Sequence, residues 1–171
     1  MIWCGKRWMS NRWVVNASPL IALCKIDHQS LLFDLTGELI LPHAVADEVA
    51  AGPADDLARQ FLAAASIPDV DAPSLPAVLA WDLGTGESAV LSYASANAGW
   101  TAVVDDGAAR RCARTLELPL IGTLGIVIRA RVRNIIPAAA PVLSALAANG
   151  FRLSDAVIRE ALARSVDEAW P

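Results

Sequence analysis

The sequence predicts an α/β fold in which helices cover both faces of a central parallel sheet of four to five strands. Short apolar runs, typical of buried strands, alternate with helical segments along most of the 171 residues. Hydrophobic residues make up 55% of the chain and charged residues 19%, a composition that excludes an intrinsically disordered protein. A chain of this length is expected to form one domain that buries its core without disulfides or structural zinc.

Apolar runs carry the strand signal, and polar or turn-forming residues follow them. The first run ends at Val15, and Asn16, Ser18 and Pro19 then favour a turn and a helix start. Pro42 ends the second run in the same way. The third run is the weakest, so the sheet is expected to have four or five strands. The expected strands are residues 13–15, 38–41, 66–70, 101–104 and 119–121.

Glycine, proline and capping residues mark the helix ends. Gly52 and Pro53 stop one helix, Gly99 and Gly150 close two others, and Ser154 caps the last one. An apolar cluster at Leu31, Leu32, Phe33 and Leu35 fits either the core or a partner surface. The expected helices are residues 20–26, 43–51, 55–65, 87–98, 107–116, 122–133, 138–148 and 155–164.

Residues 1–12 are expected to form an extension outside the fold, and residues 13–167 a single domain that includes the C-terminal helices. The extension is rich in tryptophan and basic residues and lacks the apolar core of a signal peptide. No run of about 20 apolar residues occurs, so a transmembrane segment is not expected. Cys4, Cys24 and Cys112 are odd in number and widely spaced, which favours a reducing, cytoplasmic location over a disulfide framework.

The strand ends carry the residues with the clearest chemical potential. Ligands of parallel α/β sheets bind outside the carboxyl ends of the strands, where Asn16, Ser18, Asp105, Asp106 and Thr123 are expected. Two adjacent aspartates at one strand end favour a bound cation, because their charges repel each other. They could equally form a helix cap, since aspartate is a preferred N-cap residue.

Two glutamates complete a candidate metal site. Glu87 follows Gly84 and Gly86 at a helix start, where it could simply complement the helix dipole, and Glu48 alone reads as a surface residue. Together with Asn16 and Asp105, however, they could border one edge of the sheet. Oxygen-only clusters suit Mg²⁺ or Mn²⁺, which can activate water for phosphodiester hydrolysis. The glycines alone are a weak phosphate-loop signal, because no Lys–Ser/Thr pair follows them.

The net charge of −4 argues against a protein that coats nucleic acid through overall basicity. The basic residues are nevertheless segregated, with six arginines and one acid in a short stretch after the aspartates. These arginines could bind RNA phosphates or form solvated helix faces. They are Arg110, Arg111, Arg114, Arg129, Arg131 and Arg133.

The order of these motifs resembles that of PIN-domain proteins. The stretch Asn16-Ala17-Ser18-Pro19-Leu20-Ile21-Ala22-Leu23 is similar to the first motif of the family, and residues 42–49 and 86–90 resemble the second and third. Residues 104–110 followed by Ile121-Gly122-Thr123-Leu124-Gly125 resemble the fourth motif, and residues 150–154 the tail, of a VapC-like prokaryotic subgroup. The resemblance covers residues 13 to about 167.

This resemblance implies a three-layer α/β/α PIN-like domain that binds Mg²⁺ or Mn²⁺ and hydrolyses RNA. Many relatives are toxins that a small antitoxin protein holds inactive, and they commonly form homodimers. Carried onto this chain, the catalytic and metal positions are Asn16, Glu48, Glu87 and Asp105, with Asp106 as a neighbouring metal-site residue. Ser18 and Thr123 would be supporting polar residues.

One position departs from the family pattern. The first acidic position of the family is usually aspartate, and Asn16 occupies it here. The amide oxygen can ligate a metal but brings no charge. Two hypotheses therefore follow: a metal-dependent endoribonuclease of the toxin type, and a catalytically impaired PIN-like protein that acts by binding RNA or an antitoxin. A small-molecule phosphotransferase that uses residues 84–86 ranks last.

Overall fold

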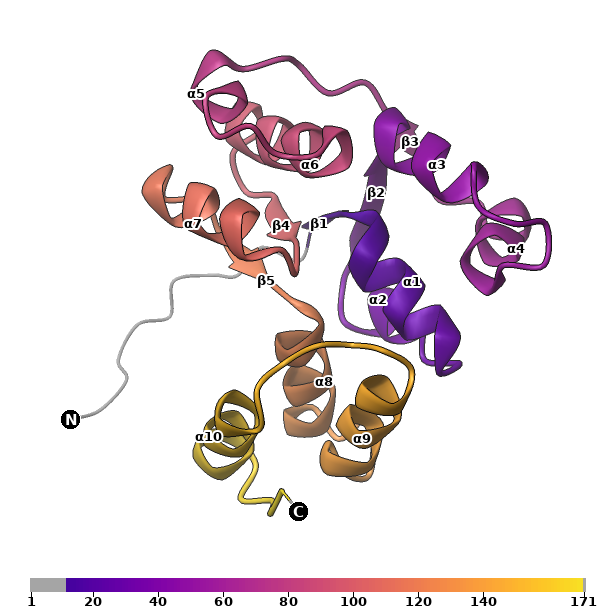
Figure 1. The fold of residues 1–171 in the computed structure, drawn as a ribbon, viewed down its shortest axis with the longest axis vertical. Coiled ribbons are helices and arrows are strands. Elements are labelled where there is room, and N and C mark those ends of the chain that lie inside the picture. The colour runs from indigo at the N-terminus through magenta and orange to yellow at the C-terminus, as the bar shows by residue number, and fades with distance from the viewer. Residues whose placement is uncertain (1–11, 171) are drawn as a thin grey trace.

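The computed structural model describes residues 12–170, and in this part of the chain five parallel strands form one sheet (Figure 1). The strand order is β3-β2-β1-β4-β5, so the chain builds the sheet outward from β1 in both directions. This arrangement confirms the predicted α/β fold. The strands are β1 (Arg12–Val15), β2 (Glu38–Pro42), β3 (Asp69–Val70), β4 (Thr101–Val103) and β5 (Leu120–Ile121).

Helices cover both faces of this sheet. α6 and α7 pack against each other on one side, and α1 and α2 contact α8 on the other (Figure 1). The helices between β1 and β4 are α1 (Ala17–Lys25), α2 (Leu31–Asp34), α3 (His43–Ala50), α4 (Leu57–Ala64), α5 (Pro76–Leu79) and α6 (Thr85–Ala96). Those that follow are α7 (Gly107–Thr115), α8 (Thr123–Val132), α9 (Ala140–Ala148) and α10 (Asp155–Ser165).

The central strand is apolar on both faces because helices cover both. Trp13, Val14 and Val15 are fully buried, and Val14 pairs in parallel with Ile40 on one side and Ala102 on the other. A continuous hydrophobic run is the expected pattern for such a doubly covered strand. The strand order reverses at β1, so β1 and β4 flank the switch point at which ligands of open α/β sheets bind.

The expected elements all occur, with shifts at their ends and two short additions. The expected strand at 66–70 is only Asp69–Val70, and Arg12, which we expected outside the fold, begins β1. The rest of the expected extension lies outside the described residues, as does Cys4. The unpredicted helices α2 and α5 are single turns. In the apolar cluster around α2, only Phe33 is exposed.

The core includes both cysteines of the described region. Cys24 and Cys112 are buried and unbonded, as expected for small core residues. Within residues 12–170, no helix combines the length and apolar character needed to cross a bilayer.

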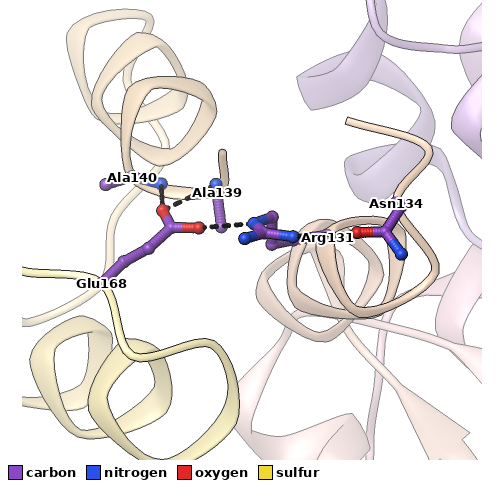
Figure 2. Close-up of polar contacts among 5 residues, drawn as sticks. All are labelled: Arg131, Asn134, Ala139, Ala140 and Glu168. Carbon is purple, nitrogen blue, oxygen red and sulfur yellow. Dashed lines mark hydrogen bonds and ion pairs between the residues drawn. The ribbon is translucent and has the colours of Figure 1, made fainter. Parts of the chain in front are cut away.

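A carboxylate near the C-terminus fastens the last residues to the helical layer (Figure 2). Glu168 accepts hydrogen bonds from the backbone amides of Ala139 and Ala140 at the start of α9, both at 2.8 Å. Its other oxygen lies 2.9 Å from Nε of Arg131, whose Nη1 donates to Asn134. Burial alone would raise the pKa of Glu168, but these donors and the arginine charge lower it below 4.5.

We expect Glu168→Gln to lower the free energy of unfolding by about 1–2 kcal/mol at pH 7, because hydrogen bonds to a charged acceptor are lost. Since the pKa is lowered in the folded protein, the contribution is complete above pH 4.5 and is lost as the pH falls through the folded value. Urea unfolding at several pH values measures it. Glu160→Gln, which removes an exposed ion pair with Arg164, should cost far less.

Candidate active site

The switch point brings two predicted site residues side by side. Asn16 follows β1 and Asp105 follows β4, and the backbone N–H of Asn16 donates to the carbonyl of Val103 in β4 at 3.0 Å. The Asn16 side chain is 1% exposed, so its position is fixed by the core. The carboxyl ends of the central strands therefore meet as the sequence predicts.

The amide of Asn16 has a defined orientation. Its Nδ2 donates to Oε1 of Glu87 in the first turn of α6 at 2.8 Å. A carboxylate accepts hydrogen bonds only, so the amide nitrogen must face Glu87 and the oxygen must face away. That oxygen, Oδ1, is buried and has no hydrogen-bond donor among the described residues.

Gly86 allows a second acidic residue to approach this oxygen. A Cβ at position 86 would lie 2.8 Å from Oδ1 of Asn16 and 2.8 Å from Oε2 of Glu48. The two oxygens are therefore at most twice that distance apart, and any larger residue would occupy the space between them. Gly86 lies inside α6, where glycine is otherwise unfavourable, so close approach is the physical reason for it.

The oxygens around Asn16 form an electronegative group. Partial burial, and then the charge of Glu87, raise the pKa of Glu48, so the two carboxylates repel each other electrostatically. An unsatisfied buried amide oxygen close to the carboxylate of Glu48, with the carboxylate of Glu87 bound to the same amide, offers oxygen ligands of the kind that a hard divalent cation prefers. Asn16, Glu48 and Glu87 are the residues that would hold such an ion.

Asp105 is held by two hydrogen bonds from Thr123. Its two oxygens accept from the backbone N–H and the hydroxyl of Thr123, at 2.7 and 2.6 Å. Burial raises the pKa of Asp105, while the hydrogen bonds from Thr123 and the charge of Arg110 act in the opposite direction. Thr123 thus orients this carboxylate, which suits the supporting role expected for it.

Gly122, before Thr123, is also required by close approach. A Cβ at position 122 would lie 2.6 Å from Nη1 of Arg110 and 2.7 Å from Oδ1 of Asp105. It would also come within 3.2 Å of the Val104 carbonyl, which cannot move aside. The glycine before α8 therefore keeps the pair of Asp105 and Arg110 together.

A cavity of about 620 Å³ opens over this edge of the sheet. Glu87 and Asp105 both line it, whereas Glu48 lines a neighbouring depression with Glu87. Ser18, expected as a supporting residue, lies on the cavity wall. Asp106 also lines the cavity, but its Oδ1 accepts from the amides of Ala108 and Ala109, so it caps α7. Of the two roles that the sequence allowed for the adjacent aspartates, helix capping is the one that Asp106 fills.

Among the described residues, no three histidine, cysteine, aspartate or glutamate side chains lie close enough together to hold a metal ion. The amide of Asn16, rather than a third acid, donates to Glu87 and lies close to Glu48, and Thr123 donates to Asp105. His43 lies at the start of α3 beside Asp69, outside this group. The arrangement is therefore two glutamates and one amide, with Asp105 lining the main cavity together with Glu87.

The structure separates the six arginines into two groups. Arg110 and Arg114 line a second cavity that also includes Asp105. Arg129 lies over the ring of Trp13 and Arg131 pairs with Glu168, which places them away from the two cavities. Arg133 donates to the carbonyl of Leu35, and Arg111, exposed on α7, lines neither cavity.

Two basic residues beside the site were not predicted to have a role. Lys25, at the end of α1, lines the main cavity, and Arg152 lines both cavities. Phe151, next to Arg152, also lines both. The only sequence signal was the motif-like tail at 150–154, because nothing local indicates that this segment returns to the sheet edge.

Comparison with known proteins agrees with this geometry. No curated protein and no solved structure matches the chain. A family model described as PIN domain matches residues 12–167, which include every strand of the sheet and all the candidate site residues. The chain therefore belongs to the PIN-domain family.

Proposed function

We propose that the protein is a metal-dependent endoribonuclease that hydrolyses RNA phosphodiesters. PIN domains are generally nucleases and typically use divalent metals. The observation that carries the proposal is the buried Oδ1 of Asn16, which has no hydrogen-bond donor among the described residues and lies close to Glu48, while Nδ2 of the same amide donates to Glu87. Unsatisfied buried oxygens are costly, and a bound cation would satisfy this one.

In this proposal each residue has a distinct role. Asn16, Glu48 and Glu87 would hold Mg²⁺ or Mn²⁺, and Asp105, oriented by Thr123, lines the main cavity together with Glu87. When bound, the ion supplies Lewis-acid activation of the phosphate and lowers the pKa of a water molecule. Arg110 and Lys25 neutralise the phosphates that would otherwise be repelled by the acidic residues.

The partners belong to the same proposal. We infer that the protein is the toxin of a VapC-like toxin–antitoxin pair, that it acts in the cytoplasm, and that it forms homodimers. These inferences rest on the resemblance of the sequence motifs to the VapC-like subgroup and on membership of the PIN-domain family. A small open reading frame directly upstream of the gene would support the antitoxin assignment.

The alternative is a catalytically impaired PIN-like protein that binds RNA or an antitoxin. The observation behind it is Asn16 itself, which supplies an amide oxygen where the family usually has a carboxylate. In the structure this amide donates to Glu87 and so orders the site without metal. The alternative predicts RNA or antitoxin binding without cleavage.

Asn16→Asp distinguishes the two functions. We expect wild-type protein to cleave single-stranded RNA in the presence of Mg²⁺ or Mn²⁺, and we expect cleavage to stop when the metal is chelated. The variant places two carboxylates in contact, so without metal it should be about 2 kcal/mol less stable. With Mn²⁺ it should bind the ion about tenfold more tightly, because the site gains a charge. RNA gels and thermal unfolding with and without Mn²⁺ measure these effects.

Asn134→Asp is the matched control, because the same change at a surface position beside Arg131 should leave metal binding and cleavage unaltered. If the Asn16→Asp variant cleaves RNA and the wild-type protein does not, the alternative of a catalytically impaired protein is supported. If neither form cleaves RNA with either ion, the proposed nuclease function is contradicted.

A further inference from the structure

A second cavity, of about 520 Å³, lies directly beside the candidate active site. Asp105, Phe151 and Arg152 line both this cavity and the main one, so the two cavities adjoin at these residues. The connection between α9 and α10 passes over the first turns of α8 and forms one wall (Figure 1). An extended molecule bound in the main cavity would therefore have the second cavity next to it.

The floor of the second cavity is apolar and carries one aromatic ring. Leu120 and Ile128 form part of it, and Val157 is 45% exposed there. Phe151 is held in place by the end of α9. Gly150, with φ +89°, donates to the carbonyl of Ala147, and the backbone N–H of Phe151 donates to Leu146 at 3.0 Å. These two bonds form a Schellman motif, which fixes the backbone from which the Phe151 ring projects.

The rim of the cavity is cationic. Arg110, Arg114 and Arg152 face a single acidic residue, Asp105. In the described part of the chain, neither Arg114 nor Arg152 has a carboxylate within ion-pair distance. Burial, and then the charge of Arg114, lower the pKa of Arg110, so the cations are crowded. An occupant should therefore carry negative charge as well as an apolar, planar surface.

We propose that the second cavity receives the base of an unpaired nucleotide next to the cleaved phosphodiester, with Phe151 stacking on the base and Arg114 and Arg152 binding its phosphates. This inference rests on the proposed ribonuclease function. A nucleotide combines a flat apolar base with an anionic backbone, which matches the floor and the rim. A base inside a duplex is stacked between its neighbours and could not enter, so Phe151 makes the protein specific for single strands.

The test is a comparison of RNA with and without bases. Fluorescence anisotropy would measure the binding of two labelled probes: a single-stranded RNA of about 12 nucleotides and an abasic ribose-phosphate chain of equal length. A metal chelator would be present so that the RNA is not cleaved. We expect Phe151→Ala to weaken RNA binding about tenfold and to leave abasic binding unchanged. Arg114→Ala should weaken both, because both chains carry phosphates.

Two further variants separate stacking from folding. Phe151→Leu keeps an apolar side chain after the α9 cap but removes the ring, so it should also lose base-dependent affinity, whereas Phe151→Tyr should retain it. Arg159→Ala, on a part of α10 that lines neither cavity, should bind both chains as wild type does. Equal effects of the Phe151→Leu substitution on RNA and on the abasic chain, or no effect on either, would overturn the proposal.

Failure of this inference can be distinguished from failure of the proposed function. Base-dependent binding through Phe151 without cleavage under any metal condition would support the cavity assignment and reject the nuclease. Metal-dependent cleavage with equal rates for wild type and Phe151→Leu would support the nuclease and reject the base site, leaving the groove to a partner of another class.

Discussion

Glu87→Gln is expected to reduce metal-dependent RNA cleavage by at least about a hundredfold, because it neutralises a proposed metal ligand. The change keeps the size of the side chain and an oxygen that can accept from Nδ2 of Asn16, so the local structure should persist. It also removes the charge that helps raise the pKa of Glu48. Thermal stability without metal should therefore be unchanged or higher while activity is lost.

The measurement is the single-turnover rate of RNA cleavage at saturating Mn²⁺, together with the melting temperature in chelator. Glu160→Gln provides the same chemical change on the exposed face of α10 and should leave the rate at the wild-type value. A Glu87→Gln protein that cleaves as fast as wild type would remove Glu87 from the catalytic site.

Gly86→Ala is expected to lower metal affinity and cleavage at least tenfold while preserving the fold. The new Cβ would lie 2.8 Å from oxygens of Asn16 and Glu48. Asn16 is buried and cannot move, whereas Glu48 is exposed and can turn into solvent, so the site would lose one of its ligands. Alanine is about 1 kcal/mol more favourable than glycine inside a helix, which offsets part of the crowding.

Ser95→Ala, in the last turn of the same helix, is the matched control, since it also adds alanine to α6 but lies far along the chain from the site. Calorimetric titration with Mn²⁺ and circular dichroism would report the two effects separately. A Gly86→Ala protein with wild-type metal affinity would show that Asn16 and Glu48 do not bind the same metal ion.

The strand-end residues of the site could be predicted because the parallel sheet places them. Asn16 comes directly after β1 and Asp105 two residues after β4, and these two strands are neighbours at the switch point. Glu48 carried no signal of its own, because a single glutamate in an alanine-rich helix looks like a surface residue. Only the order of the family-like motifs pointed to it, and Gly86 explains how it reaches Asn16.

The arginines show where counting charges along the sequence is insufficient. α8 begins at the site edge of the sheet, beside Asp105, and runs away from it. The last turn of α8 is therefore distant from the site. Arg129, in that turn, lies over the ring of Trp13 at the start of β1. α7 also begins at the site edge, which places Arg110 in its first turns near Asp105, and Arg114 in its last turn still lines the second cavity.

The residues that the sequence missed belong to segments placed by long-range packing. Phe151 and Arg152 reach the site because the connection after α9 returns across α8, and no local pattern encodes that return. The helices α2 and α5 were missed for a different reason. Each has four residues, too few to display a helical period.

The central claim is that Asn16, Glu48 and Glu87 together hold a divalent ion. Electron paramagnetic resonance of Mn²⁺ titrated with the protein tests it directly, because the signal of the free ion falls as the ion binds. We predict that wild-type protein reduces the free signal and that Glu87→Gln reduces it far less. An undiminished signal with wild type, or an equal reduction by both proteins, would contradict the account.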